Sequence, residues 1–101
     1  MDDLKFRDMV DDIRSRTDIV RLIGETVKLK PGGSVLRGRS LRNRDKTPSL
    51  VVWPHTMTWR DFSGGGSEGG DCFDFLAYRD GLGFMDALRF LAARVGIELS
   101  I

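Results

Sequence analysis

The middle of the chain carries a cluster of basic side chains that could bind phosphate groups. Five of the ten residues from 37 to 46 are basic and only Asp45 is acidic. Arginine and lysine attract phosphates by displacing counterions, and aromatic rings stack on unpaired bases. The candidate nucleic-acid-binding residues are Arg37, Arg39, Arg42, Arg44, Lys46, Trp53, Trp59 and Arg60. The alternative is a solvated arginine-rich face with both tryptophans in the core.

Other kinds of chemistry have little support in the sequence. With one histidine and one cysteine, the chain shows no catalytic constellation, so we expect no enzymatic activity. The single cysteine, Cys72, excludes an internal disulfide and is typical of a reducing compartment. No apolar run approaches the ~20 residues that span a membrane, and no signal peptide is visible. We therefore expect a cytoplasmic protein with no membrane contact.

Two loops could also bind anions. Lys46-Thr47-Pro48-Ser49 could present an ammonium and hydroxyls to a phosphate, and an equal alternative is that Pro48 only restricts the start of the next strand. The glycine-rich segment 64–70 leads into a helix N-terminus, where backbone amides can hold an anion. It lacks the nucleotide-binding fingerprints, so we expect no nucleotide site there.

The spacing of apolar residues predicts the elements that position these side chains. Helices are expected over residues 3–15, 19–23, 72–80 and 84–95, and strands over 27–30, 34–38, 49–53 and 57–62. Pro31-Gly32-Gly33 is expected to be a turn. This order predicts one α+β domain over residues 1–101, a small antiparallel meander sheet flanked by N- and C-terminal helices.

A set of short motifs then follows in order along nearly the whole chain, from Leu4 to Leu99. These motifs are Arg16-Thr17-Asp18-Ile19-Val20, Ile23-Gly24, Val27-Lys28-Leu29-Lys30, Gly38, Asp45-Lys46-Thr47-Pro48-Ser49, Gly69-Gly70, Asp74-Phe75-Leu76, Ala87-Leu88, Leu91-Ala92 and Gly96-Ile97-Glu98-Leu99. In this order they resemble the N-terminal zinc-binding domain of bacterial DnaG-type primases, the CHC2 zinc ribbon. The resemblance implies a ribbon surface that contacts single-stranded template.

The resemblance also implies a zinc site whose ligands are missing. Such domains hold zinc with a Cys-x-x-His pair before the Lys-Thr-Pro-Ser segment and a Cys-x-x-Cys pair after the next strand. The corresponding positions here are Ser40, Asn43, Asp61 and Gly64. None of the four is a thiolate or an imidazole, the sulfur and nitrogen donors that tetrahedral zinc prefers, and Gly64 has no side chain, so we expect no metal and no cofactor.

Other groups must then stabilise the ribbon. We expect hydrogen bonds from the three polar residues at the ligand positions, and a charge-assisted contact to Asp61 from Arg42 or Arg60. The expected fillers of the vacated space are Trp53, Trp59 and Phe62. His55 and Cys72 lack ligand spacing, and zinc held between chains through Cys72 is the remaining alternative.

The sequence supports two functions. The first is a metal-free module that binds single-stranded DNA during primer initiation, as an accessory or as a domain of a larger primase, for example in a mobile element. The second is a scaffold that docks on a primase, helicase or polymerase through its first or last helix.

Overall fold

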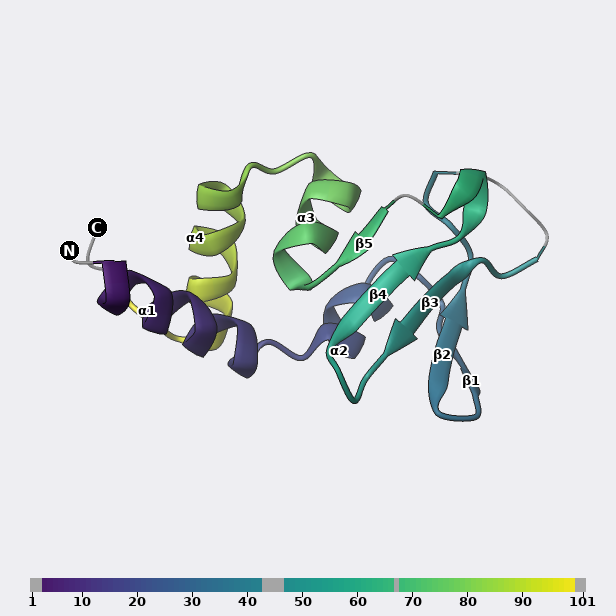
Figure 1. Ribbon diagram of the computed structural model, residues 1–101, viewed down its shortest axis with the longest axis horizontal. Helices are drawn as coiled ribbons and strands as arrows, with labels where there is room; N and C mark the ends of the chain where they lie inside the picture. Colours follow the sequence, from purple (N-terminus) through teal and green to yellow (C-terminus); the bar gives the residue numbers. More distant parts are fainter. Residues whose placement is uncertain (1–2, 43–46, 67, 100–101) are drawn as a thin grey trace.

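The computed structural model describes residues 3–42, 47–66 and 68–99 (Figure 1). Its centre is a five-stranded sheet in which each strand pairs antiparallel with the next strand of the chain. The strands are β1 (Lys30–Gly32), β2 (Val35–Gly38), β3 (Leu50–Trp53), β4 (Thr58–Asp61) and β5 (Glu68–Gly70). The predicted α+β meander is confirmed.

Four helices flank the sheet. They are α1 (Asp3–Arg16), α2 (Ile19–Gly24), α3 (Cys72–Asp80) and α4 (Phe84–Val95), with a short 3₁₀ turn η1 (Ser63–Gly65) before β5. Figure 1 shows α1 and α4 at one end of an elongated molecule and the β1–β2 hairpin at the other, with extents of 46 × 25 × 20 Å. None of the helices within the described ranges is both long and apolar enough to cross a membrane.

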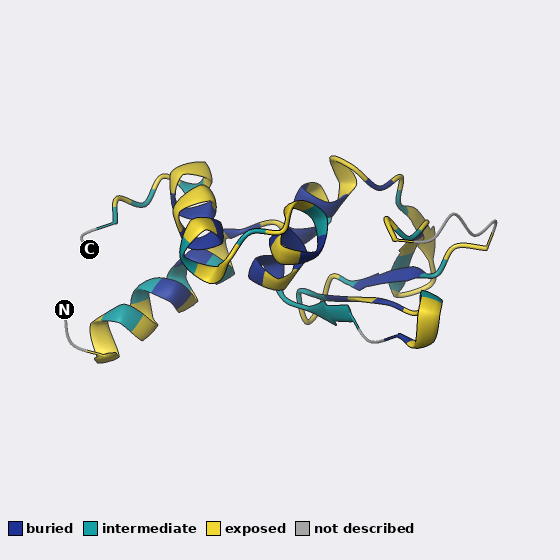
Figure 2. Cartoon of the chain, turned by 90° about the horizontal axis from the view of Figure 1, so that it is seen from above, coloured by how far each residue is buried: buried dark blue, intermediate teal, exposed yellow. Residues whose placement is uncertain are grey.

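The core lies between the helices and one face of the sheet (Figure 2). Leu50, Val52 and Trp59 project from β3 and β4 into this core. Trp59 is 2% exposed, its indole N–H donates to the backbone oxygen of Asp71 at 2.9 Å, and its ring centroid lies 4.7 Å from that of Tyr78. A buried ring of this size removes 150 Å² or more from water, so Trp59 is a structural residue.

The first strand lies further along the chain than the alternating pattern predicts. The expected strand over 27–30 and turn over 31–33 are wrong, because β1 runs through Pro31 and the turn is at Gly33 and Ser34. β1 is an edge strand, where a proline without an N–H is tolerated. Gly33 has φ +73°, which suits glycine, and Val27 is buried in the core instead of alternating on a strand.

The fifth strand lies within the segment that the sequence predicts to be a flexible glycine loop. Glycines carry no hydrophobic pattern, so the usual strand signal is missing there. The structure shows why small residues are needed: a Cβ on Gly69 would lie 2.6 Å from the backbone oxygen of Trp59. The close approach of β5 to β4 therefore requires glycine at this position.

The start of α3 is fixed by a capping box at Asp71. The Asp71 carboxylate accepts the backbone N–H groups of Phe73 and Asp74, and the Asp74 carboxylate accepts the N–H of Asp71. Arg14 of α1 donates to Asp71 at 3.0 Å, which connects the N-terminal helix to this cap. The cap determines which side chains of α3 face the sheet, Tyr78 among them.

Replacement of Gly38 by alanine tests the packing of the first hairpin. A Cβ at Gly38 would collide with Val27 and lie 3.1 Å from the backbone oxygen of Lys28. We expect Gly38→Ala to lower the free energy of unfolding by about 1–3 kcal/mol in urea titrations. Gly24→Ala, with no atom within 4 Å of its Cβ, is the control and should leave stability equal or slightly higher. Equal stability of both variants would contradict this packing.

Candidate nucleic-acid interface

A buried carboxylate organises the positions at which the resembled family holds zinc. Asp61, at the end of β4, is 2% exposed. Its Oδ1 accepts the backbone N–H of Ser63 at 2.9 Å and the Ser63 hydroxyl at 2.6 Å. Its Oδ2 accepts the Ser40 hydroxyl and, at 2.8 Å, the phenol of Tyr78. We call Ser40, Asp61, Ser63 and Tyr78 the polar cluster; it joins the residues after β2 to β4 and α3.

Arg42 closes the polar cluster on the outside. Its guanidinium lies over the Tyr78 ring, 4.5 Å from the centroid, and makes two hydrogen bonds to the carboxylate of Glu68, at 3.0 and 3.2 Å. The Tyr78 oxygen also accepts the backbone N–H of Leu41 at 2.7 Å. Arg42 is thus occupied by Tyr78 and Glu68. Arg60, the other arginine expected to contact Asp61, donates to the backbone oxygen of Gly66.

Hydrogen bonds determine the protonation state of Asp61. Burial alone would raise the pKa of this carboxyl, but the donors from Ser40, Ser63 and Tyr78 outweigh burial and lower it. Burial raises the pKa of Tyr78, which keeps the phenol protonated and able to donate. The polar cluster is therefore one buried anion surrounded by neutral donors.

The residues at these positions do not fit a zinc ion. A carboxylate offers about four acceptor positions, and protein donors occupy four on Asp61. Gly64 has no side chain, and the described residues contain no group of three or more histidine, cysteine or acidic side chains suited to a metal. Cys72 is buried, and burial followed by the charge of Asp71 raises its pKa to about 11, so the thiol stays protonated.

The opposite face of the sheet carries a basic row. Register places Lys30, Arg37, Val51 and Arg60 directly opposite one another on β1 to β4. Cross-strand partners project to the same face, and Val52 and Trp59 alternate into the core, so the row lies on the outer face. Like charges opposite each other, as at Lys30 and Arg37, destabilise a sheet unless an anion lies between them.

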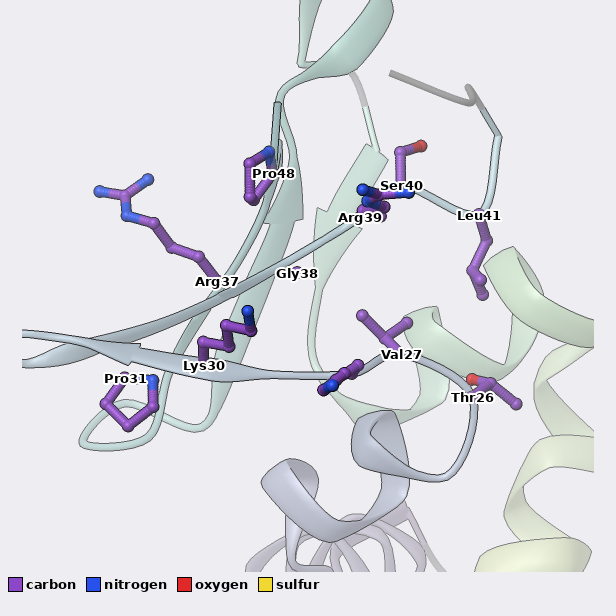
Figure 3. A pocket seen from close by; sticks show the side chains of 11 residues that line it. Thr26, Val27, Lys30, Pro31, Arg37, Gly38, Arg39, Ser40, Leu41 and Pro48 are labelled. Atoms are coloured by element: carbon purple, nitrogen blue, oxygen red, sulfur yellow. The ribbon is translucent and has the colours of Figure 1, made fainter. Parts of the chain in front are cut away.

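Next to this row lies a groove of about 790 Å³ between the segment 26–31 and residues 37–41, with Pro48 on its wall (Figure 3). Four basic residues line it: Lys28, Lys30, Arg37 and Arg39. None of its lining residues is acidic, and the part of the chain that the structure describes offers these four side chains no ion pair. Figure 3 shows the Arg37 guanidinium directed away from its strand. We call this feature the basic groove.

The predicted site residues therefore separate into groups. Arg37 and Arg39 line the basic groove, Arg60 lies in the same row, and Trp53 is half-buried on the outer face. Arg42 belongs to the polar cluster and Trp59 to the core, the arrangement that the structural alternative predicted for this tryptophan. Asn43, Arg44 and Lys46 lie outside the described residues.

Sequence reasoning missed several residues of these sites, Ser63 among them. Lys28 and Lys30 look like the polar positions of a strand; the register brings Lys30 beside Arg37, and Lys28 joins them in the lining of the basic groove. Tyr78 and Glu68 were missed because their partners are far away in sequence. The spacing of Phe75 and Tyr78 on one helix face indicated burial, without showing what the phenol contacts.

Substitution of Asp61 tests the polar cluster. Because its pKa is lowered on folding, Asp61 stabilises the protein above its unfolded pKa of about 3.9, and this contribution is lost as pH falls through the folded value. We expect Asp61→Asn to lose about 1–3 kcal/mol at pH 7, since an amide cannot accept all four donors, and to lose this acid dependence.

Chemical denaturation between pH 2 and pH 7 is the measurement (roughly the range over which Asp titrates). Asp86→Asn, on the exposed surface of α4, is the matched control and should behave like the unsubstituted protein. A stable Asp61→Asn variant with unchanged acid dependence would show that the polar cluster does not stabilise the fold.

Known proteins are similar to this chain in sequence. Residues 5–101 match the family model described as CHC2 zinc finger. The chain is 38% identical over 90 residues to a DNA primase of Neisseria meningitidis and 36% identical over 95 residues to one of Thermotoga maritima, covering 89% and 94% of this chain. The match spans only 15% and 16% of those primases.

The fold matches a solved primase as well. The crystal structure of the Aquifex aeolicus primase, containing zinc-binding and RNA polymerase domains, superposes with a TM-score of 0.82 and 32% sequence identity. The superposition covers 91% of this chain and 22% of that one. The chain belongs to the CHC2 zinc finger family of DnaG-type DNA primases.

Proposed function

We propose that this chain is a metal-free primase zinc-ribbon-like module that binds single-stranded DNA during primer initiation in the cytoplasm. The observation that carries the proposal is the basic groove, with four cationic side chains and no acidic one in its lining. Membership in a primase family supports a role in replication for this chain. The matched region corresponds to the zinc-binding part of a primase, so we assign no catalysis to it.

Phosphate binding would offset the repulsion among the cations of the basic groove. Lys30 opposite Arg37 costs stability in the free protein, and a bound phosphodiester removes that repulsion. Neutralised phosphates release counterions, so binding should weaken steeply with salt. The polar cluster contributes by holding the residues after β2 in place at one end of the groove. Ser40 belongs to both features, and the neighbouring groove residue Leu41 donates its backbone N–H to Tyr78.

A second function, docking on another replication protein, is supported by the exposed apolar side chains of the helices. Leu4 of α1 is 71% exposed, and Phe84 and Phe90 of α4 are 46% and 41% exposed. The helices α1 and α4 lie at the end of the molecule opposite the β1–β2 hairpin, whose Lys30 and Arg37 line the basic groove (Figure 1). Loss of a partner's binding on Phe90→Ala, with DNA binding retained, would support this scaffold role.

Charge removal in the basic groove tests DNA binding. We expect the double variant Lys30→Gln, Arg37→Gln to bind a labelled single-stranded oligonucleotide more weakly, and its salt dependence, the slope of log K against log salt, to decrease by about 1. Fluorescence anisotropy at several salt concentrations measures both quantities.

The matched control is the double variant Arg7→Gln, Arg89→Gln, which removes the same charge from exposed positions on α1 and α4. It should retain nearly all of the affinity. If both double variants lose affinity equally, binding depends on net charge and the basic groove is not the site.

A further inference from the structure

Two aromatic side chains lie on the same outer face as the basic groove. Trp53 follows Val51 by two residues on β3, and Phe62 follows Arg60 by two residues, so alternation places both on this face. The backbone N–H of Phe62 donates to Ser49 at 2.8 Å, which continues the β3–β4 ladder to this residue. Their ring centroids are 6.2 Å apart with planes at 73°, an edge-to-face pair. We call this pair the aromatic shelf.

One ring of the aromatic shelf is exposed where burial would be favourable, while Trp53 is half-buried. Phe62 is 51% exposed, although burying a phenylalanine typically contributes about 1.5–3 kcal/mol. Three other rings carry an arginine over their face, namely Phe73, Phe75 and Tyr78. Neither ring of the shelf has such a contact among the described residues, despite the nearby cationic row. The shelf therefore keeps an aromatic surface open beside the phosphate-binding groove.

The width of the row of basic residues across the sheet fits one extended ligand. Lys30, Arg37 and Arg60 lie on β1, β2 and β4, and strands are ~4.8 Å apart, so the row is about 14 Å wide. A phosphodiester chain lying across it would place its phosphates in the basic groove and a base near Phe62. Every base has a face that can stack, so this contact needs an unpaired base and no particular sequence.

We propose that the aromatic shelf stacks an unpaired base while the basic groove binds the flanking phosphates, which makes Phe62 the residue that selects single strands over duplex. This inference rests on the proposed DNA binding and adds the residues that distinguish an unpaired strand from a duplex. A duplex offers the same phosphates but hides its base faces within the stack. The selectivity therefore comes from Phe62 and Trp53, and most of the salt dependence from the groove.

Removing the Phe62 ring and removing the bases of the DNA strand should weaken binding through the same contact, so their effects on affinity should not add. The experiment titrates the protein and Phe62→Ala with a labelled single strand and with the same strand made abasic. We expect the abasic strand to bind the unsubstituted protein roughly 5-fold or more weakly, by the usual value of one stacked base. Phe62→Ala should lose a similar factor on the normal strand and nothing further on the abasic strand or a duplex.

Three further variants sharpen the test. Phe62→Trp should retain affinity, whereas Phe62→Leu, apolar but without a ring, should lose as much as alanine. Phe90→Ala, a comparably exposed phenylalanine on α4, should change nothing. Since Phe62 is half exposed, its variants should remain folded, and thermal unfolding checks this before each titration.

The outcomes separate the two proposals. If the unsubstituted protein binds both strands equally well and Phe62→Ala does not change this, the aromatic shelf is not a base site, while the basic groove stands. If the protein binds neither strand at low salt, DNA binding itself is wrong. If Phe62→Leu binds as well as the unsubstituted protein, the contact is apolar rather than stacking, which also overturns the inference.

Discussion

The structure depends on one buried carboxylate. Asp61 takes hydrogen bonds from two serines and a tyrosine and so connects the end of β2, the end of β4 and α3. The first two of these segments carry the positions at which the resembled domains hold zinc. A buried charge is tolerated only when its acceptors are satisfied. The loss of any one donor would therefore leave an acceptor position of the buried anion unsatisfied.

This arrangement leaves the two faces of the sheet with different tasks. The core face carries Trp59 and the helices, and the polar cluster connects the segments at its end. The outer face carries Arg37 and its basic neighbours, whose mutual repulsion weakens the sheet. Under the proposed function, stability and DNA binding depend on opposite faces of one small sheet.

Local signals in the sequence predict most of the fold but only part of the site. The α3 cap at Asp71 and the period of α4 depend on neighbouring residues, so they could be predicted. β5 could not, because its glycines carry no pattern, and β1 was misplaced because its edge position tolerates Pro31. The partners of Asp61 and the grouping of Lys28 with Arg37 arise from tertiary packing and register, which spacing along the chain does not contain.

The most direct test of the central claim is thermal unfolding of the purified protein with a strong chelator and with added zinc, combined with metal analysis of the same sample. Structural zinc in small domains contributes on the order of 10 kcal/mol, so its removal would unfold a zinc-dependent ribbon. The hydrogen bonds of Asp61 predict the same unfolding midpoint in both conditions and no bound zinc. A midpoint that falls with chelator, or one zinc per chain, would contradict the account.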